Sequence, residues 1–492
     1  MRRVFPARLA LLALLVMTAL ACATNPVTGK RQISFMDEEQ EIRTGREMDA
    51  EVRREMGIYQ DDTLQKYVED LGMKLAHESQ RPNLPWHFTI VDSPAVNAFA
   101  LPGGYIYITR GILPYLNNEA QLAGVLGHEI GHVAARHSAQ QYTRAAATSV
   151  GVLISSIFVP AMRSLGGLAE TGLGTMFLKY SRENELQADA LGAEYAAAGG
   201  WDPAQVPEFL TTLARIDEVS DRSGTPNWLQ THPQPENRVD RVQATVSKVR
   251  TTAEAQPFAV NRDQYLQKIN GMIFGENPEE GIVRGAEFIH PSLRFAVTFP
   301  DGWDITNGEE QVVAQEPGNK VFMVLETVRT NASSRAALAS GLQSAATQHM
   351  KSAGYKEIDG SATRINGLDA FVGTYDGSAS GIGKVRSRAA VIASGRNTYF
   401  VGGVAKPEDY PHVEAAFNNA IRTFRELARD EADDVQPNKV ELYTARSGDT
   451  WQSIAQGPGK GFVKATTLAI MNDHAVADQP TAGERIKIVV AG

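Results

Sequence analysis

The chain has very little cysteine and no concentrated positive charge. Cys22 is the only cysteine among 492 residues, so no disulfide can form within the chain. Lys and Arg total 48 against 57 Asp and Glu, the net charge is −9, and no block is rich in Lys and Arg. This balance argues against nucleic acid as a partner. A hydrophobic fraction of 43% is typical of a globular chain. The length predicts about three domains.

The N-terminus has the three parts of an export signal. Three arginines among the first eight residues supply positive charge, Leu9 to Leu20 form an apolar stretch, and small residues precede Cys22. The apolar stretch is too short to span a bilayer comfortably. We therefore predict a cleaved signal over residues 1–21 and an exported protein.

The position of Cys22 suggests a second use. The segment Ala19-Leu20-Ala21-Cys22 resembles a bacterial lipobox, although Ala19 stands where Leu is usual. This resemblance predicts that Cys22 is lipidated; the alternative is a plain cleaved signal. Ala23 replaces the Asp that typically retains such proteins at the inner membrane, so we expect the protein in the periplasm, anchored to the outer membrane.

Pattern and turn residues predict the secondary structure of the first domain, residues 22–255. Ser34 is expected to cap the first helix, and Asn117 or Asn118 the helix that carries the central motif. The apolar stretch 145–177 has three interpretations: a buried helical hairpin, a flap over a cleft, or a membrane-contacting segment. The predicted helices are 37–56, 63–76, 120–141, 183–197 and 203–218, and the predicted strands are 86–91, 97–100 and 105–108.

Two further domains follow. Short alternating strands at 295–299, 320–328 and 397–404, with helices at 333–353 and 411–423, predict an α+β domain over residues 280–428. An acidic linker is expected over 430–438. Residues 439–490 form a last unit, considered below.

The segment His128-Glu129-Ile130-Gly131-His132 is a HExxH motif inside a predicted helix. Residues four apart lie on one helix face, so both imidazoles can bind one cation. Zinc lowers the pKa of a bound water toward about 7, and Glu129 is placed to take its proton. The motif thus predicts a zinc hydrolase.

A catalytic zinc site needs a third protein ligand. His137 lies about 140° around the helix from His132 and does not fit the metzincin spacing, so we interpret it as structural or as a partner of a ligand. Glu185 is the better candidate, because Asp189 follows it by one turn and could accept a hydrogen bond from a ligand imidazole. Glu183 is a rival that lacks such a partner.

These motifs resemble the gluzincin family that includes the CAAX prenyl endopeptidases, HtpX and the exported BepA-type proteases. The resemblance rests on HExxH, on Glu185-x-x-x-Asp189 some fifty residues later, and on the segments 97–104 and Thr231-His232-Pro233. It covers residues 25 to 250. It implies one zinc ion bound by His128, His132 and Glu185, with Glu129 as general base and Asp189 as a partner of a ligand.

The resemblance also gives His232 a role beside the metal. Similar proteins use this histidine either to stabilise the oxyanion or to occupy the water position in a latent enzyme; both are chemically sensible. Arg238 could assist substrate or transition state, or form a surface ion pair. The hairpin that contains Asn97, Ala98 and Phe99 offers an edge to which an extended peptide could add.

The C-terminal unit, residues 439–490, resembles a LysM module, a small βααβ fold that binds glycans. The resemblance rests on the segment Tyr443 to Trp451, together with Leu468, Asn472, Gly483 and Ile486. It implies peptidoglycan as a partner; the alternative is a packing module.

We therefore expect an α+β multidomain chain: a mainly helical zincin-like domain with a small edge-stranded sheet, an α+β domain and a LysM-like domain. We predict a zinc endopeptidase that cleaves unfolded or misassembled envelope proteins. The alternatives are a largely latent, chaperone-like scaffold associated with peptidoglycan, and a peptidoglycan hydrolase.

Overall fold

The fold is that of a computed structural model. It describes residues 22–33, 36–141, 180–219, 228, 232, 238–252, 257–308, 311–318, 320–328, 335–379 and 382–491. The predicted export signal, the apolar stretch 145–177 and three single residues of the sequence argument, Ser34, Thr231 and Pro233, lie outside this set. Within these ranges, helices that combine the length and the hydropathy needed to span a bilayer are absent.

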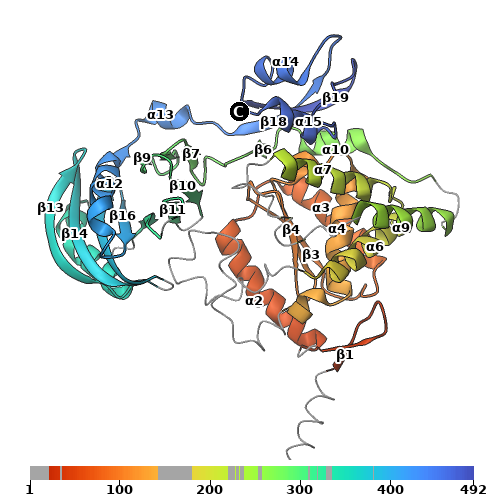
Figure 1. The fold of residues 1–492 in the computed structure, drawn as a ribbon, viewed down its shortest axis with the longest axis horizontal. Helices are drawn as coiled ribbons and strands as arrows, with labels where there is room; N and C mark the ends of the chain where they lie inside the picture. Colours follow the sequence, from red (N-terminus) through yellow and green to blue (C-terminus); the bar gives the residue numbers. More distant parts are fainter. Residues whose placement is uncertain are drawn as a thin grey trace, which may run out of the picture.

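The N-terminal domain is mainly helical (Figure 1). Its strands are β1 Cys22–Thr24, β2 Arg31–Ile33, β3 His87–Val91, β4 Ala98–Leu101 and β5 Tyr105–Thr109. Its helices are α2 Glu38–Met56, α3 Asp62–His77, η1 Leu113–Tyr115, α4 Glu119–Ala134, α6 Arg182–Ala198, α7 Gln205–Val219, α9 Arg238–Thr252 and α10 Arg262–Ile269.

Side chains that accept from backbone N–H groups fix where these helices begin. Asp37, three residues after the expected Ser34, caps α2 and forms a capping box with Gln40. Asn118 caps α4 through the backbone N–H of Gln121. The cap of α4 is thus one of the two asparagines expected from the sequence.

The small sheet has the strand order β3-β5-β4. β4 pairs with β5 in antiparallel register, with Ala98 opposite Ile108, and β3 pairs with β5 in parallel. Every residue of β4 and β5 is buried. β4 therefore forms the edge of the sheet, on the hairpin that the sequence predicted.

Helix α4 runs through the middle of the domain, and all its residues are buried. It packs closely on α6 where two glycines meet. A Cβ on Gly192 would lie 2.9 Å from the backbone nitrogen of His128, and one on Gly127 would lie 3.0 Å from the carbonyl oxygen of Gly192. This contact needs glycine on both helices, and it brings the HExxH helix beside the helix that carries Glu185.

Helix α4 ends earlier than predicted. The predicted helix runs to about residue 141, yet α4 ends at Ala134. Arg136 adopts a left-handed conformation with φ of 63°. Its guanidinium is held by the buried carboxylate of Glu41 and the backbone carbonyl of Met36. A separate helical turn begins at His137. The prediction of one continuous helix was wrong because the contacts that hold Arg136 come from Glu41 of α2 and from Met36, 95 and 100 residues away in sequence.

The middle domain contains a seven-stranded antiparallel sheet with the order β10-β11-β12-β16-β15-β14-β13. Side chains of α12 and α11 belong to separate buried clusters on its two faces. Several strands are longer than predicted. The elements are β7 Ile282–Arg284, β8 Glu287–His290, β9 Phe295–Thr298, β10 Asp304–Asn307, β11 Gln311–Gln315, β12 Phe322–Thr327, α11 Arg335–Ser352, β13 Lys356–Ile365, β14 Leu368–Ala379, β15 Gly383–Ser394, β16 Asn397–Ala405, α12 Tyr410–Thr423 and β17 Arg425–Glu426.

The expected acidic linker is partly ordered. Helix α13, Arg429–Asp433, buries Ala432. Ala432 and Val435 pack with apolar residues of the sheet β17-β9-β8-β7. Charge alone therefore gave an incorrect interpretation of this segment, because two of its few apolar residues anchor it.

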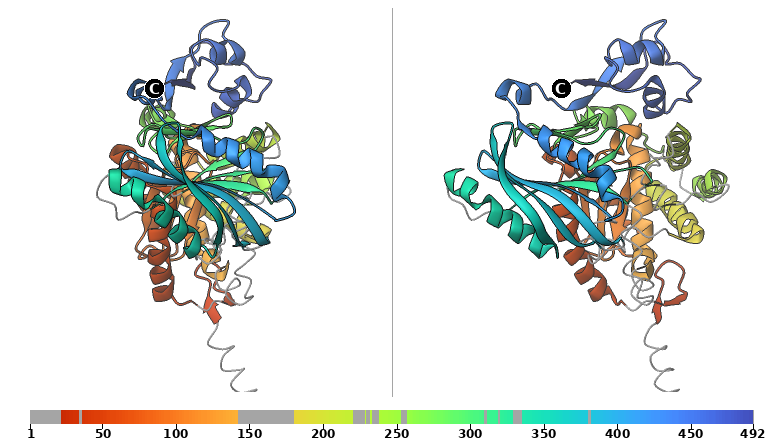
Figure 2. Two further views of the ribbon diagram at one scale, coloured as in Figure 1. Left: turned by 90° about the vertical axis from the view of Figure 1, so that its left-hand side faces the viewer. Right: turned by 60° about the vertical axis from the view of Figure 1, so that its left-hand side comes forward.

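The C-terminal unit has the predicted order of strand, helix, helix and strand: β18 Asn438–Thr444, α14 Trp451–Gln456, α15 Ala465–Met471 and β19 Arg485–Ala491. β18 also pairs with β6, Ile273–Phe274. The unit lies beside α7 and α10 (Figures 1 and 2). Tyr265 and Leu266 of α10 share one buried cluster with residues of α4, so the packing of the N-terminal domain continues past residue 255.

Candidate metal centre

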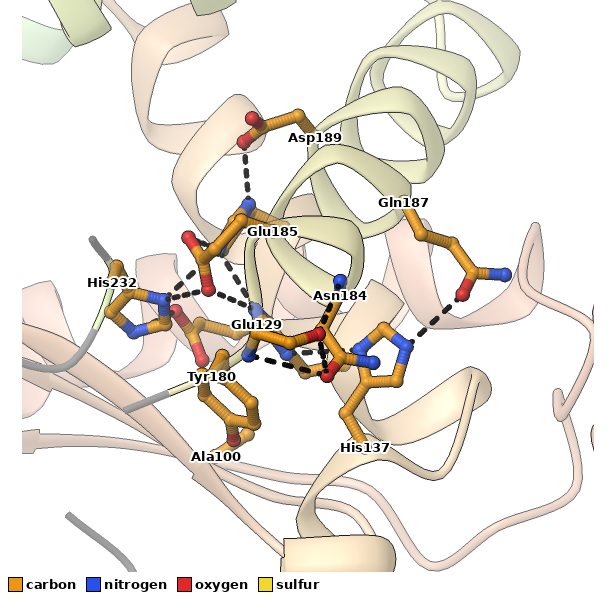
Figure 3. A network of polar contacts seen from close by, with 12 residues as sticks. Ala100, Glu129, His137, Tyr180, Asn184, Glu185, Gln187, Asp189 and His232 are labelled. Carbon is orange, nitrogen blue, oxygen red and sulfur yellow. Dashed lines mark hydrogen bonds and ion pairs between the residues drawn. The ribbon is translucent and has the colours of Figure 1, made fainter. Parts of the chain in front are cut away.

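Two helices bring the three predicted ligands together. His128 and His132 lie one turn apart on α4. Glu185 extends from α6, as Figure 3 shows. His132 Nε2 is 3.0 Å from His128 Nε2 and 3.4 Å from Glu185 Oε1. His128 Nε2 is 3.7 Å from Glu185 Oε2. The rival Glu183 is exposed, whereas Glu185 is fully buried, so α6 directs only the second carboxylate inward.

A fourth side chain, His232, joins this group. Its Nδ1 lies 3.0 Å from Glu185 Oε1 and 3.3 Å from His128 Nε2. The ligand atoms of His128, His132, Glu185 and His232 all lie within 4.8 Å of one another, and the group could bind a metal ion. His232 thus lies among the candidate ligand atoms, close to where the resemblance expects it.

Glu129 lies beside the group. Its carboxylate is fully buried, and within the described ranges neither oxygen accepts a hydrogen bond. His232 Nε2 is 3.7 Å from Glu129 Oε1. A buried carboxylate without a donor is costly unless another group satisfies it. The donor set of two imidazoles and one carboxylate, with a second carboxylate adjacent, fits a catalytic zinc site.

Asp189 and Arg238 support the ligands from behind. His128 Nδ1 lies 2.9 Å from Asp189 Oδ1. Arg238 donates from Nε to Asp189 Oδ2 at 2.6 Å and from Nη2 to Asp189 Oδ1 at 2.7 Å, and its Nη2 is 3.1 Å from Glu185 Oε2. Arg238 is only 2% exposed. It is therefore a buried partner of two carboxylates, not the surface ion-pair former that the sequence also allowed.

A known protein family matches the part of the chain that contains this group. The model of peptidase family M48 matches residues 62–246, which contain all the residues of the group. Residues 62–246 are an M48 peptidase domain. The chain therefore carries a metallopeptidase domain, in keeping with the HExxH motif.

The chain is also similar to several curated proteins. The beta-barrel assembly-enhancing protease of Escherichia coli (strain K12) is 32% identical over 255 residues, 50% of this chain and 51% of the relative. The protein of the same name from Yersinia pestis is 29% identical over 353 residues, 68% and 70% of the two chains. The mitochondrial metalloendopeptidase OMA1 of Arabidopsis thaliana is 31% identical over 189 residues, 38% and 36%. The chain thus spans about half the length of the first of these relatives.

Burial and charge set the protonation of the M48 site in opposite directions. Burial, opposed by the charges of His232 and His128, raises the pKa of Glu129. Burial lowers the pKa of His132 well below its usual value. Burial alone would raise the pKa of Glu185, but the charges of His232 and Arg238 outweigh it and hold that pKa well below the ordinary value. The site thus holds Glu185 as an anion and His132 as a neutral imidazole, the forms that bind metal.

Sequence reasoning missed two aromatic residues of the M48 site. Trp228 is 1% exposed, and its ring stacks on His232 with centroids 4.3 Å apart. The Tyr180 ring lies 3.8 Å from the ring of His132. Tyr180 directly precedes Ser181, the cap of α6, so an aromatic residue at the start of the ligand helix was the available signal. Trp228 lies four residues before His232, and the backbone N–H of His232 donates to its carbonyl at 2.7 Å, so this short spacing to a predicted site residue was the available signal.

The predicted substrate edge lies next to this centre. Asn97, Ala98 and Phe99 are buried at the start of β4. Ser138 Oγ donates to the carbonyl of Ala100 at 3.2 Å, and the backbone N–H of Trp228 donates to the carbonyl of Val96 at 3.1 Å. Two carbonyl groups along this segment are therefore already bonded to residues close to the metal group.

Proposed function

We propose that the M48 domain is a zinc endopeptidase that hydrolyses peptide bonds within polypeptides. The observation that carries the proposal is the meeting of His128, His132 and Glu185 beside Glu129, whose buried oxygens accept no hydrogen bond in the described part of the chain. This donor set is that of catalytic zinc sites. The similarity to relatives named as metalloendopeptidases supports the proposal.

Each side chain then has a distinct task. A zinc ion held by His128, His132 and Glu185 would polarise the scissile carbonyl and acidify the attacking water. Glu129 takes the proton from that water and passes it to the leaving amine nitrogen, a transfer favoured by its raised pKa. Asp189 orients His128, and Arg238 holds the carboxylates of Asp189 and Glu185 in place.

The position of His232 favours a second candidate function. A catalytic zinc site has three protein ligands and one open position, whereas four protein ligands are typical of a structural site. His232 supplies a fourth candidate ligand atom. We infer that this conformation is latent and that His232 must leave the ligand group before cleavage. A largely latent peptidase that acts as a chaperone-like, peptidoglycan-associated scaffold is the alternative.

For the substrate, we propose unfolded or misassembled envelope proteins. The support is the predicted export signal and the similarity to relatives named as beta-barrel assembly-enhancing proteases. Lipidation at Cys22 would anchor the protein to the outer membrane on its periplasmic side. A LysM-like unit over residues 439–490 would bind peptidoglycan. Fractionation of cells that carry Cys22→Ala and co-sedimentation with purified peptidoglycan test these two points; release of the variant from membranes and sedimentation of the unmodified chain are expected.

The central experiment measures zinc content and cleavage of β-casein by a chain that lacks residues 1–21. We expect about one zinc per chain. Glu129→Gln keeps its metal and loses cleavage, because an amide cannot take the proton. His232→Ala increases cleavage, because it opens a ligand position. Glu194→Gln, on the exposed side of α6, is the matched control and behaves as the unmodified chain.

The outcomes separate the candidates. Metal without cleavage in all variants, including His232→Ala, would favour the scaffold. A chain that binds no zinc would overturn both candidates. Loss of cleavage in His232→Ala would instead assign His232 to the transition state and reject latency.

A further inference from the structure

We infer that His137 is a positioning residue, which fixes the tautomer and the ring orientation of His132 through a hydrogen-bond chain that ends at Gln187. His137 does not belong to the group whose ligand atoms converge. The inference rests on the proposed zinc site, because the tautomer of His132 matters only if that residue binds metal.

A metal-binding imidazole needs a partner at its second nitrogen. One ring nitrogen offers its lone pair to the metal, and the other carries a hydrogen that requires an acceptor. For His128, that acceptor is Asp189, 2.9 Å from Nδ1. For His132, Nε2 faces the group and Nδ1 lies 3.1 Å from His137 Nδ1. The two ligands are therefore supported differently, one by a carboxylate and one by another imidazole.

The far side of His137 sets the direction of this hydrogen bond. Two ring nitrogens share a hydrogen bond only if one carries the hydrogen and the other a lone pair. His137 Nε2 lies 3.1 Å from Gln187 Oε1, and an amide oxygen can only accept (Figure 3). His137 Nε2 therefore carries the hydrogen, and its Nδ1 is left to accept from His132 Nδ1. His132 Nε2 then faces Glu185 with a bare lone pair.

The opposite orientation of the amide would give the wrong tautomer. If the NH₂ group of Gln187 faced His137, a neutral His137 would carry its hydrogen on Nδ1 and donate to His132. The hydrogen of His132 would then sit on Nε2, pointing into the ligand group. Side-chain amides are assigned from such networks, and only the oxygen-inward orientation is compatible with a metal.

The backbone explains how His137 reaches this place. On a continuous helix it would lie about 140° from His132. The left-handed residue Arg136 ends the helix instead, and its side chain is fixed by Glu41 and Met36. This change of chain direction at Arg136 places the ring of His137 beside the ring of His132, with centroids 5.0 Å apart.

The test is the zinc dissociation constant, measured by competition with a chromogenic chelator on the chain that lacks residues 1–21. Gln187→Leu removes the final acceptor and leaves His137 in place, whereas Gln187→Glu keeps an acceptor oxygen. We expect Gln187→Leu and His137→Phe to weaken zinc binding about 10- to 100-fold, and Gln187→Glu to stay close to the unmodified chain. Gln243→Leu, on the exposed side of α9, is the matched control.

Comparison of Gln187→Leu with Gln187→Glu tests the positioning role of His137 even if His137→Phe fails to fold. Equal affinity of Gln187→Leu and the unmodified chain overturns the inference, and so does equal weakening in Gln187→Leu and Gln187→Glu. The metal-free unfolding temperature of Gln187→Leu should match that of the unmodified chain, which separates lost orientation from damaged packing. An unmodified chain without zinc affinity would overturn the proposed function instead.

Discussion

Replacing Arg238 by methionine should destabilise the M48 domain more than the loss of any surface ion pair would. Arg238 is 2% exposed and contacts both Asp189, at 2.6 Å, and Glu185, at 3.1 Å. Methionine fills part of the space but leaves two buried carboxylates without their cation. Breaking a buried pair in this way costs about 3–5 kcal/mol. For a domain of this size, each kcal/mol lowers the melting temperature by roughly 2–4 °C, so a fall of about 6–20 °C is expected.

The measurement is thermal and urea unfolding with all metal removed by chelator, so that lost zinc does not contribute. Arg250→Met on the same helix is the control, because Arg250 is half-exposed and lies 3.4 Å from Asp202. It should cost less than about 1 kcal/mol. If Arg238→Met and Arg250→Met prove equally stable, the buried charges are compensated by something other than Arg238, and the reasoning fails.

Three further predictions concern packing, metal and pH. Gly192→Val should separate α6 from α4, because its Cβ would lie 2.9 Å from His128 N; we expect reduced zinc content and a loss of about 1–3 kcal/mol in unfolding experiments. Chelator should lower the melting temperature of the unmodified chain, since zinc at 1,000 times its dissociation constant adds about 4 kcal/mol; an unchanged transition would contradict this. Burial lowers the pKa of His290 from 6.5 to about 4. Below pH 6.5 the unfolded chain gains a proton at His290 that the folded chain does not gain until about pH 4. The free energy of unfolding therefore falls by at most about 3 kcal/mol over this range, and His290→Asn should flatten that part of the stability curve.

The ligand group was predictable because its geometry is local. Four-residue spacing on a helix places His128 and His132 on one face whatever the rest of the fold does. The same rule distinguished Glu185 from Glu183, because only Glu185 has a carboxylate one turn further on. Burial of Glu185 and exposure of Glu183 agree with that choice.

The remaining features depend on contacts between distant segments. The rule that placed His137 away from the metal assumed a helix continuing past Ala134, and the helix ends there because Arg136 finds Glu41 on α2. The contact of Trp228 with His128 has the same character, since no periodicity in the sequence joins Trp228 to α4. Local rules fail where a long-range side-chain contact decides the backbone.

The metal helix is held at its end carbonyls by residues far from it in sequence. The last carbonyl groups of a helix need donors from outside the helix. At this end of α4, Asn25 Nδ2 donates to the carbonyl of Ala135, and Arg81 Nη1 donates to that of Val133, each at 3.1 Å.

The start of α4 is also held by several hydrogen bonds from distant residues. Glu119 in its first turn accepts from Tyr67, Trp201 and Asn261 at 2.7–2.8 Å. Just before the cap, the carbonyl of Leu116 accepts from Lys487 Nζ at 2.6 Å, and Lys487 belongs to the C-terminal unit. Burial holds the pKa of Lys487 well below its usual value, so the contact suits a neutral amine. Metal sites depend on ligand geometry held within about half an ångström. The C-terminal unit, through Lys487, is therefore part of the support of the metal helix.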